Sequence, residues 1–319
     1  MGSLRSSAVV AAVDGSPAAT EAARTAALEA DRRHAQLRLV HAFAWPTEPL
    51  PGLPDVAEAR AAAQRCAVGD VERLRGTLTH LLPPGSVTTA VVDGSPEDVL
   101  HRESTSAALL VLGAAGRTWG HGPMPGSVAE IVVATAECPV LVHRRPSGPG
   151  RPRGVVAAVD GAAGTAELLA VAAAEARLRG APLHVVHAWR QLTEDAVHCL
   201  RWRLDTDVSS RAERALVEEE ADRVRRGHPG LQVQLSVLPD RAGHLLVQLA
   251  DTAALLVVGR TAGRTTRRSA TVHAALHRTS VPLLAVPVAA LVMPEADATP
   301  PSVPLPAQPL DERDTRPVG

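Results

Sequence analysis

The chain has no lysine and no tyrosine, a single phenylalanine and only three cysteines among its 319 residues. Without lysine it cannot carry a Walker-type phosphate loop, because the GxxxxGK[ST] motif requires that residue. The three scattered cysteines are too few for a disulfide framework or a thiolate metal site, and they indicate a reducing compartment. We therefore expect a cytoplasmic protein without a metal centre.

The chain also lacks an excess of charge and a long apolar run. Thirty-three basic and 34 acidic residues leave a net charge of −1, which provides no field for holding nucleic acid. No apolar run reaches the ~18 residues that span a bilayer. The first residues do not form a signal-peptide pattern. We expect a soluble protein with neither nucleic acid nor membrane as a partner.

One heptapeptide, VVAAVDG, occurs twice, at Val9–Gly15 and at Val155–Gly161, 146 positions later. The same offset relates VHA at 40–42 to 186–188 and LLVLG at 109–113 to LLVVG at 255–259. Further on, CPVLV at 138–142 matches VPLLA at 281–285 with an offset of 143. The chain is therefore a tandem duplication, and its second copy lacks three residues between Gly259 and Pro282.

Each copy alternates short apolar runs with Ala-, Glu- and Arg-rich stretches. The apolar runs are typical of parallel strands buried on both faces, and the alternation is typical of an α/β domain. In the first copy we expect strands at 8–13, 37–43, 87–92, 109–112 and 140–143, and helices near 17–34, 55–80, 96–105 and 127–136. We predict domains at 1–145 and 154–288, a Pro/Gly/Arg linker at 146–153 and a disordered Pro-rich tail at 289–319.

A glycine-rich loop follows the fourth expected strand, in the segment LLVLGAAGRTWGHGPMPGSVAEIVV at 109–133. Glycines let backbone N–H groups approach a ligand closely, and the helix expected to begin at Ser127, with that serine as its N-cap, adds oriented donors. The segment therefore predicts a phosphate cradle, to which Arg117 could add a charge. A plain flexible connector is the alternative. No GxGxxG is present, which disfavours a Rossmann dehydrogenase.

The word VDGSP occurs at 13–17 and again at 92–96, where it does not mark a repeat. At the second position we expect Ser95 to be an N-cap and Pro96 the first helical residue. Glu97 and Asp98 follow in the first helical turn, where they would repel an anion. The corresponding helix near residue 17 has Ala18 and Ala19 in its first turn, so no acidic side chain at these two positions would repel an anion.

The spacing Gly113-x2-Gly116-x9-Gly126-Ser127 resembles the ATP-binding signature of the universal stress protein family. The stretches AAVDGS, which contains Asp14, and CPVLVHR resemble that family too, and the resemblance covers both repeats. It implies two tandem doubly wound domains, each with a five-stranded parallel sheet of the adenine-nucleotide alpha hydrolase-like type. It also implies ATP, with or without Mg²⁺, at the carboxyl ends of the first and fourth strands, as expected for open α/β sheets.

Carried over residue by residue, the resemblance places Asp14, Gly15 and Ser16 near the nucleotide and gives Val40 backbone contacts to adenine. It assigns the ribose and phosphates to Gly113, Gly116, Arg117, Gly126, Ser127 and Val128. For Asp14 a helix-entry turn, and for Ser127 an N-cap, remain alternative roles that do not exclude ligand contact.

The second copy keeps Asp160, Gly161 and Gly259 as equivalent positions, but its loop is three residues shorter. Ala262 replaces the second glycine, and Ser269-Ala270 replaces Gly126-Ser127. This site has either lost or weakened nucleotide binding, or it holds an anion through arginine side chains; a solvated basic loop is the third interpretation. The arginines concerned are Arg260, Arg264, Arg267 and Arg268.

No nucleophile, base and orienting group are placed together by any motif, so we assign no catalytic residues. The resemblance implies an ATP-binding regulatory protein of the stress response or dormancy, acting on an unknown protein partner. A slow ATPase and a nucleotide-independent scaffold are the alternatives. The two copies could pack through their last strands with pseudo-twofold symmetry, and a homodimer of chains is compatible with the resemblance.

Overall fold

A computed structural model of the chain describes residues 8–46, 55–115, 126–144, 154–161, 164–188, 206–238, 242–250, 253–261 and 270–288. The predicted linker at 146–153 and tail at 289–319 lie outside these ranges, so the domain boundaries stay predictions. The first repeat comprises β1 (Val9–Ala12), α1 (Pro17–Arg32), β2 (Leu37–Phe43), α2 (Val56–Leu78), the short 3₁₀ helix η1 (Thr79–Leu81), β3 (Val87–Asp93), α3 (Pro96–Ser104), β4 (Leu109–Gly113), α4 (Ser127–Thr135) and β5 (Val140–His143).

The second repeat follows the same alternation of strand and helix. Its elements are β6 (Gly154–Val159), α5 (Thr165–Arg179), β7 (Leu183–Ala188), α7 (Thr206–Gly227), β8 (Val233–Leu238), α8 (Ala242–Ala250), β9 (Ala253–Thr261), α9 (Ala270–Arg278) and β10 (Leu283–Val288). None of the helices in the described ranges combines the length and the hydropathy of a membrane span.

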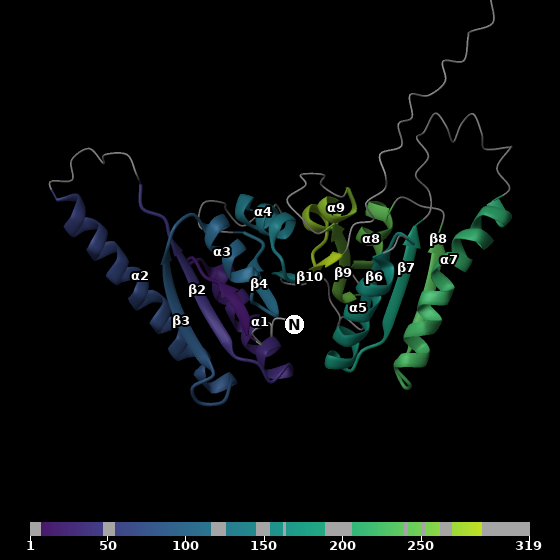
Figure 1. Cartoon of the computed structure of the whole chain (residues 1–319), viewed down its shortest axis with the longest axis horizontal. Coiled ribbons are helices and arrows are strands. Elements are labelled where there is room, and N and C mark those ends of the chain that lie inside the picture. The colour runs from purple at the N-terminus through teal and green to yellow at the C-terminus, as the bar shows by residue number, and fades with distance from the viewer. Residues whose placement is uncertain are drawn as a thin grey trace, which may run out of the picture.

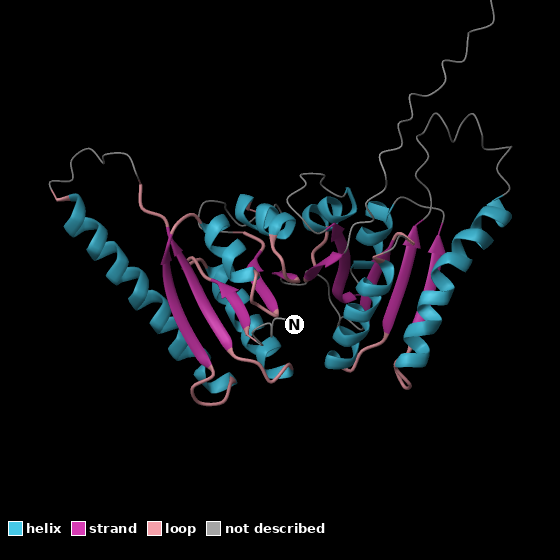
Figure 2. Ribbon diagram, in the orientation of Figure 1, coloured by secondary structure: helices cyan, strands magenta, loops and turns pink. Residues whose placement is uncertain are grey.

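The ten strands of the described ranges form one sheet in the order β3-β2-β1-β4-β5-β10-β9-β6-β7-β8 (Figures 1 and 2). Neighbouring strands within each repeat are parallel, which confirms the predicted five-stranded doubly wound architecture. The repeats join where β5 and β10 pair antiparallel, with Leu284 opposite Leu141. The last strand of each repeat is therefore the surface through which the two repeats pair, as expected from the sequence.

Successive strand residues point to opposite faces of the sheet, and a hydrophobic cluster covers each face. Val9 and Ala11 belong to one hydrophobic cluster, which α1, α2, α5 and α7 complete. Val10 and Leu110 belong to the other, which α3, α4, α8 and α9 complete. Each cluster includes residues of both repeats, so the junction is part of a continuous core.

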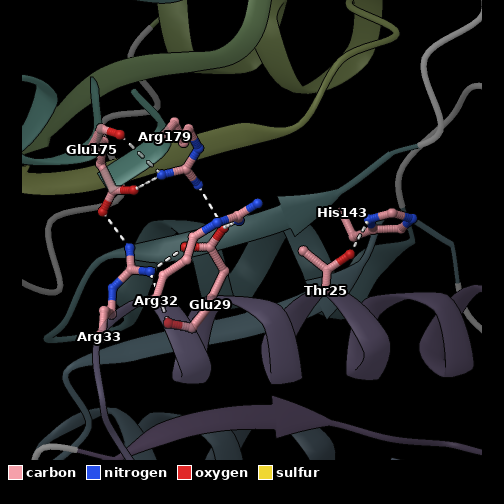
Figure 3. A network of polar contacts seen from close by, with 7 residues as sticks. All are labelled: Thr25, Glu29, Arg32, Arg33, His143, Glu175 and Arg179. Carbon is pink, nitrogen blue, oxygen red and sulfur yellow. Dashed lines mark hydrogen bonds and ion pairs between the residues drawn. The ribbon is translucent and has the colours of Figure 1, made fainter. Parts of the chain in front are cut away.

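A cluster of charged residues also links α1 to α5 at the junction (Figure 3). Glu29 on α1 and Arg33, which directly follows α1, are related to Glu175 and Arg179 on α5 by the repeat offset of 146. Arg33 pairs with both carboxylates, and Arg179 pairs with both as well, its Nη2 lying 2.6 Å from Glu29 Oε1. Arg32 adds a further contact to Glu29 at 2.7 Å. We call Glu29, Arg33, Glu175 and Arg179 the junction ion-pair cluster; its reciprocity is that of a pseudo-twofold interface.

Candidate functional site

A pocket of about 130 Å³ opens at the carboxyl ends of β1 and β4. The chain winds in opposite directions from these two neighbouring strands, so the pocket lies at the switch point where open α/β sheets bind ligands. Its described lining residues are Ala12, Val13, Asp14, Ala19, Val40, Ala42, Pro96, Leu100, Leu112, Gly113, Ala114, Ala115, Gly126, Ser127, Val128 and Ala129.

The turn after β1 brings Asp14 to the pocket and starts α1. Asp14 Oδ1 accepts the backbone N–H of Ser16 at 2.9 Å, and Gly15 adopts a positive φ of 82° that favours glycine. The Ser16 hydroxyl accepts the N–H of Ala19 at 3.1 Å as the N-cap of α1. Asp14 therefore does form the helix-entry turn, and it lines the pocket as well. Ser16 supports the turn and is absent from the described lining.

Small apolar side chains from β1, β2 and α3 line one part of the pocket, including Ala12, Ala42 and Leu100. Val40 belongs to this part, but its carbonyl oxygen already accepts the N–H of Val13 at 2.9 Å. What Val40 can still offer a ligand is its side chain and the second lone pair of that oxygen. An apolar part of this kind suits the flat face of a nucleobase.

The start of α4 forms the polar part of the pocket. Gly126 and Ser127 both line it, and the N–H of Gly126 donates to Ala114 O at 2.8 Å, which closes the loop at its base. The helix begins at Ser127 with Gly126 as the N-cap and no side-chain cap, so the prediction of Ser127 as the N-cap was wrong by one position. The first N–H groups of a helix have no partner within it and point outward from its end. They can therefore donate to an anion.

Two predicted contact residues, Gly116 and Arg117, lie outside the described residues. Gly113 is described, and it stands where the end of β4 closely approaches the start of α1. A Cβ placed there would meet the carbonyl carbon of Ala18 at 3.0 Å and its oxygen at 3.1 Å. The strand end of β4 thus packs directly against the first turn of α1.

The start of α3 has the cap expected from the sequence. Ser95 precedes the helix, and its hydroxyl accepts the N–H of Asp98 at 3.2 Å while donating to the Asp98 carboxylate at 2.8 Å. Pro96 and Leu100 of this helix line the pocket. Glu97 and Asp98, the acidic residues of the first turn of α3, are not among the described lining residues.

The equivalent place in the second repeat is occupied differently. Gly161 repeats the positive φ, at 74°, after β6. However, β9 and β10 continue pairing to Thr261 and Val288, beyond the ends of β4 and β5. A Cβ on Gly164, the counterpart of Ala18, would meet Val288 Cβ at 2.7 Å. The Val288 side chain therefore fills the space beside Gly164 that the counterpart alanine side chain would need.

Arg260 does not face this second site. Its side chain is buried, and its guanidinium donates to carbonyl oxygens at the end of α4, in the other repeat. The interpretation of Arg260 as a replacement anion ligand was therefore wrong, because both of its Nη groups donate to backbone carbonyls of the first repeat and the side chain is buried there. The other three arginines of that interpretation lie outside the described residues. In the ranges that the structure describes, no group of three or more His, Cys, Asp or Glu is arranged to hold a metal.

Sequence reasoning missed most of the apolar residues that line the pocket, such as Ala12, Ala42 and Leu112. Their only signal is position, since they stand at the ends of strands next to the switch point. It also missed Pro96 and Leu100, which belong to a helix considered only for its capping residues.

Fold and pocket together define a doubly wound α/β protein with a pocket at its switch point. The chain belongs to the universal stress protein family, whose model matches residues 6–144 and again 153–287. Universal stress protein Rv2623 of Mycobacterium tuberculosis is 30% identical over 259 residues, covering 79% of this chain and 85% of the relative. Universal stress protein Rv3134c of the same species is 32% identical over 261 residues, covering 78% and 87%. A universal stress protein structure from Archaeoglobus fulgidus matches the fold with a TM-score of 0.61 at 14% identity, over 90% of this chain and 98% of that one.

Proposed function

We propose that this chain is a regulatory protein that binds one ATP in the pocket of its first repeat. The nucleotide occupancy would change the surface around the pocket and so the affinity for a protein partner, in a stress response or dormancy. As expected from the scattered cysteines, the proposed location is the cytoplasm. Some universal stress proteins bind adenine nucleotides, and solved members of the family are complexes with cAMP and with dAMP. The proposal for this chain rests on its own pocket.

The observation that carries the proposal is the division of the pocket into an apolar and a polar part. Alanine and leucine side chains next to β1, β2 and α3 would receive the adenine, with Val40 beside it. Asp14, on the turn after β1, would contact the ribose hydroxyls as an acceptor. The N–H groups at Ser127 and Val128 would hold the phosphates, and Gly113 and Gly126, which have no side chain, would let the phosphates approach the backbone closely. Gly15, Gly116 and Arg117 complete the proposed contacts.

We propose that the second repeat binds nucleotide weakly or not at all. Asp160, Gly161 and Gly259 stand at the positions of proposed contacts, but Val288 packs beside Gly259, with its methyl carbons 3.6 and 3.7 Å from where a Cβ would stand. The chain would then be a two-repeat protein with one nucleotide and one structural repeat.

Calorimetric titration of the full chain with ATP and excess Mg²⁺ tests the proposal through a matched pair of variants. Asp14→Ala removes the carboxylate that lines the pocket, whereas Asp160→Ala removes its counterpart in the second repeat. We expect Asp14→Ala to weaken binding at least about tenfold, the effect of ~1.4 kcal/mol of lost contacts, and Asp160→Ala to leave it within about twofold. Equal affinities for the two variants would contradict the assignment of the site.

Phosphate release measured in the same samples separates the regulatory proposal from the slow ATPase. The described lining residues contain one titratable side chain, that of Asp14. We expect no turnover above that of the Asp14→Ala variant.

A further inference from the structure

Arg260 belongs to the second repeat, but its guanidinium contacts backbone carbonyls of the first repeat. It directly follows Gly259 and is the counterpart of Ala114, which lines the pocket in the first repeat. Arg260 is only 4% exposed. Its Nη1 lies 3.5 Å from Ala134 O, and its Nη2 donates to Ala136 O and lies 3.4 Å from Cys138 O. These oxygens belong to the last turn of α4 and the residues just after it.

The carbonyl end of α9, the last helix of the second repeat, is likewise contacted by an arginine that comes from the first repeat. Arg144, which follows β5 in the first repeat, is 8% exposed and donates to Leu276 O and, at 2.9 Å, to Thr279 O at the end of α9. The two arginines do not occupy equivalent repeat positions, so duplication alone does not account for them. In each case a guanidinium from one repeat covers the carbonyl end of the last helix of the other, where a cation is favoured by the helix dipole.

These two helix ends differ in what lies at the opposite end of the helix. The N-terminus of α4, at Gly126 to Ala129, lines the pocket of the first repeat. The N-terminus of α9 lies in the second repeat, where we propose little or no nucleotide binding. Helix α4 has nine residues and is therefore about 13 Å long, so a tilt at its carbonyl end moves its N–H end as well.

We propose that Arg260 is a positioning residue for the nucleotide site of the first repeat: by holding the carbonyl end of α4, it fixes the N–H groups at the other end of that helix against the phosphates. This inference rests on the proposed ATP site. Under this inference the second repeat contributes to the nucleotide affinity of the first repeat, even where the second repeat itself binds no nucleotide. Two residues of α3 also contact this end of α4, since His101 bonds to Thr135 O at 3.1 Å and Ser104 accepts the N–H of Glu137 at 2.9 Å. These two contacts come from the first repeat. From the second repeat, His277 of α9 also reaches α4, with its Nε2 2.8 Å from Glu130 Oε1. Arg260 is the described second-repeat side chain that donates to the carbonyl end of α4.

The pair Arg260→Met and Arg144→Met separates positioning from general stability. Both substitutions keep an unbranched apolar chain and remove a buried guanidinium from a helix end, so we expect both to lower Tm. In calorimetric titrations of the full chain with ATP and Mg²⁺, we expect Arg260→Met to raise Kd at least about fivefold, the lower end of typical coupling between sites, and Arg144→Met to leave it within about twofold. Equal Kd values for Arg260→Met, Arg144→Met and the wild type would overturn the inference.

Arg260→Lys is the second variant, and it also covers a failure of Arg260→Met to fold. Lysine keeps the charge but has a compact ammonium in place of the planar fork, so it cannot hold several carbonyls at once in the same way. We expect a Kd between those of the wild type and Arg260→Met. A Kd equal to that of the wild type, when Arg260→Met does not fold, would count against positioning.

Amide hydrogen exchange without nucleotide keeps this inference separate from the proposed function. We expect faster exchange at residues 126–129 in Arg260→Lys and Arg260→Met than in Arg144→Met. If the wild type binds no ATP, the proposed function fails by itself, and the exchange rates still decide whether Arg260 holds α4. Equal rates at 126–129 in all variants would overturn the positioning role.

Discussion

Gly113 and Gly259 are equivalent residues at the ends of β4 and β9, but they stand in different surroundings. A Cβ at Gly113 would meet the backbone of Ala18 at 3.0 and 3.1 Å, whereas a Cβ at Gly259 would meet only side-chain carbons of Leu168 and Val288, at 3.6 and 3.7 Å. Backbone cannot move aside as a side chain can. The two repeats therefore impose different requirements on the same position of their sequence.

This difference predicts that Gly113→Ala lowers the free energy of unfolding by about 1–3 kcal/mol, as overpacking does, while Gly259→Ala changes it by less than ~0.5 kcal/mol. Urea denaturation of the two full-length variants measures both values. An equal loss in the two variants would show that the contact with Ala18 does not constrain Gly113.

At the scale of the element, α1 and α3 each begin with a serine cap. Ser16 is 5% exposed and caps α1 through the N–H of Ala19. We predict that Ser16→Ala lowers the free energy of unfolding by about 1 kcal/mol, the usual loss for a serine N-cap. Ser95→Ala, which removes the cap of α3, is the matched variant and should cost a similar amount by the same denaturation measurement. An unchanged stability in Ser16→Ala would show that the cap contributes nothing to α1.

The elements also show how far the sequence alone could lead. The strands at 37–43 and 140–143 were predicted at the bounds that the structure has, because apolar β-branched runs flanked by turns define them. The pairing of the last strands was predicted as well. The extension of β9 and β10 to Thr261 and Val288 was not, since pairing between strands that are distant in sequence leaves no local pattern. The sequence also suggested Arg260 as one of the arginines that could hold an anion. Its actual partners lie in the other repeat, and no local sequence pattern encodes such a contact.

At the scale of the whole molecule, the junction ion-pair cluster links the two repeats. The side chain of Glu29 is 2% exposed and contacts arginines of both repeats. We predict that Glu29→Ala lowers the free energy of unfolding by about 3–5 kcal/mol, because it leaves the largely buried guanidinium groups of Arg33 and Arg179 to share one carboxylate, that of Glu175. Glu219→Ala is the control: it removes a pair with Arg223 in which both side chains are more than half exposed, and it should cost at most ~1 kcal/mol. Equal losses in the denaturation of the two variants would contradict a structural role for the cluster.

The same cluster predicts how stability depends on pH. Burial raises the pKa of Glu29, but Arg179 and Arg33 outweigh it, so the pKa of this carboxyl lies below its ordinary value. The folded state therefore binds the proton less readily than the unfolded chain, and the stabilisation is present above the ordinary carboxyl pKa and lost as the pH falls through the lowered one. We expect Glu29→Gln to flatten the fall of Tm with acid. A Tm profile parallel to that of the wild type would contradict this assignment.

The central claim concerns the whole chain: two repeats share one sheet, but only the first holds a nucleotide. Native mass spectrometry of the full-length protein with ATP and Mg²⁺ counts ligands and subunits together and tests this claim directly. The account predicts a mass increase of one nucleotide per chain at saturation. No bound nucleotide, or two per chain, would contradict it.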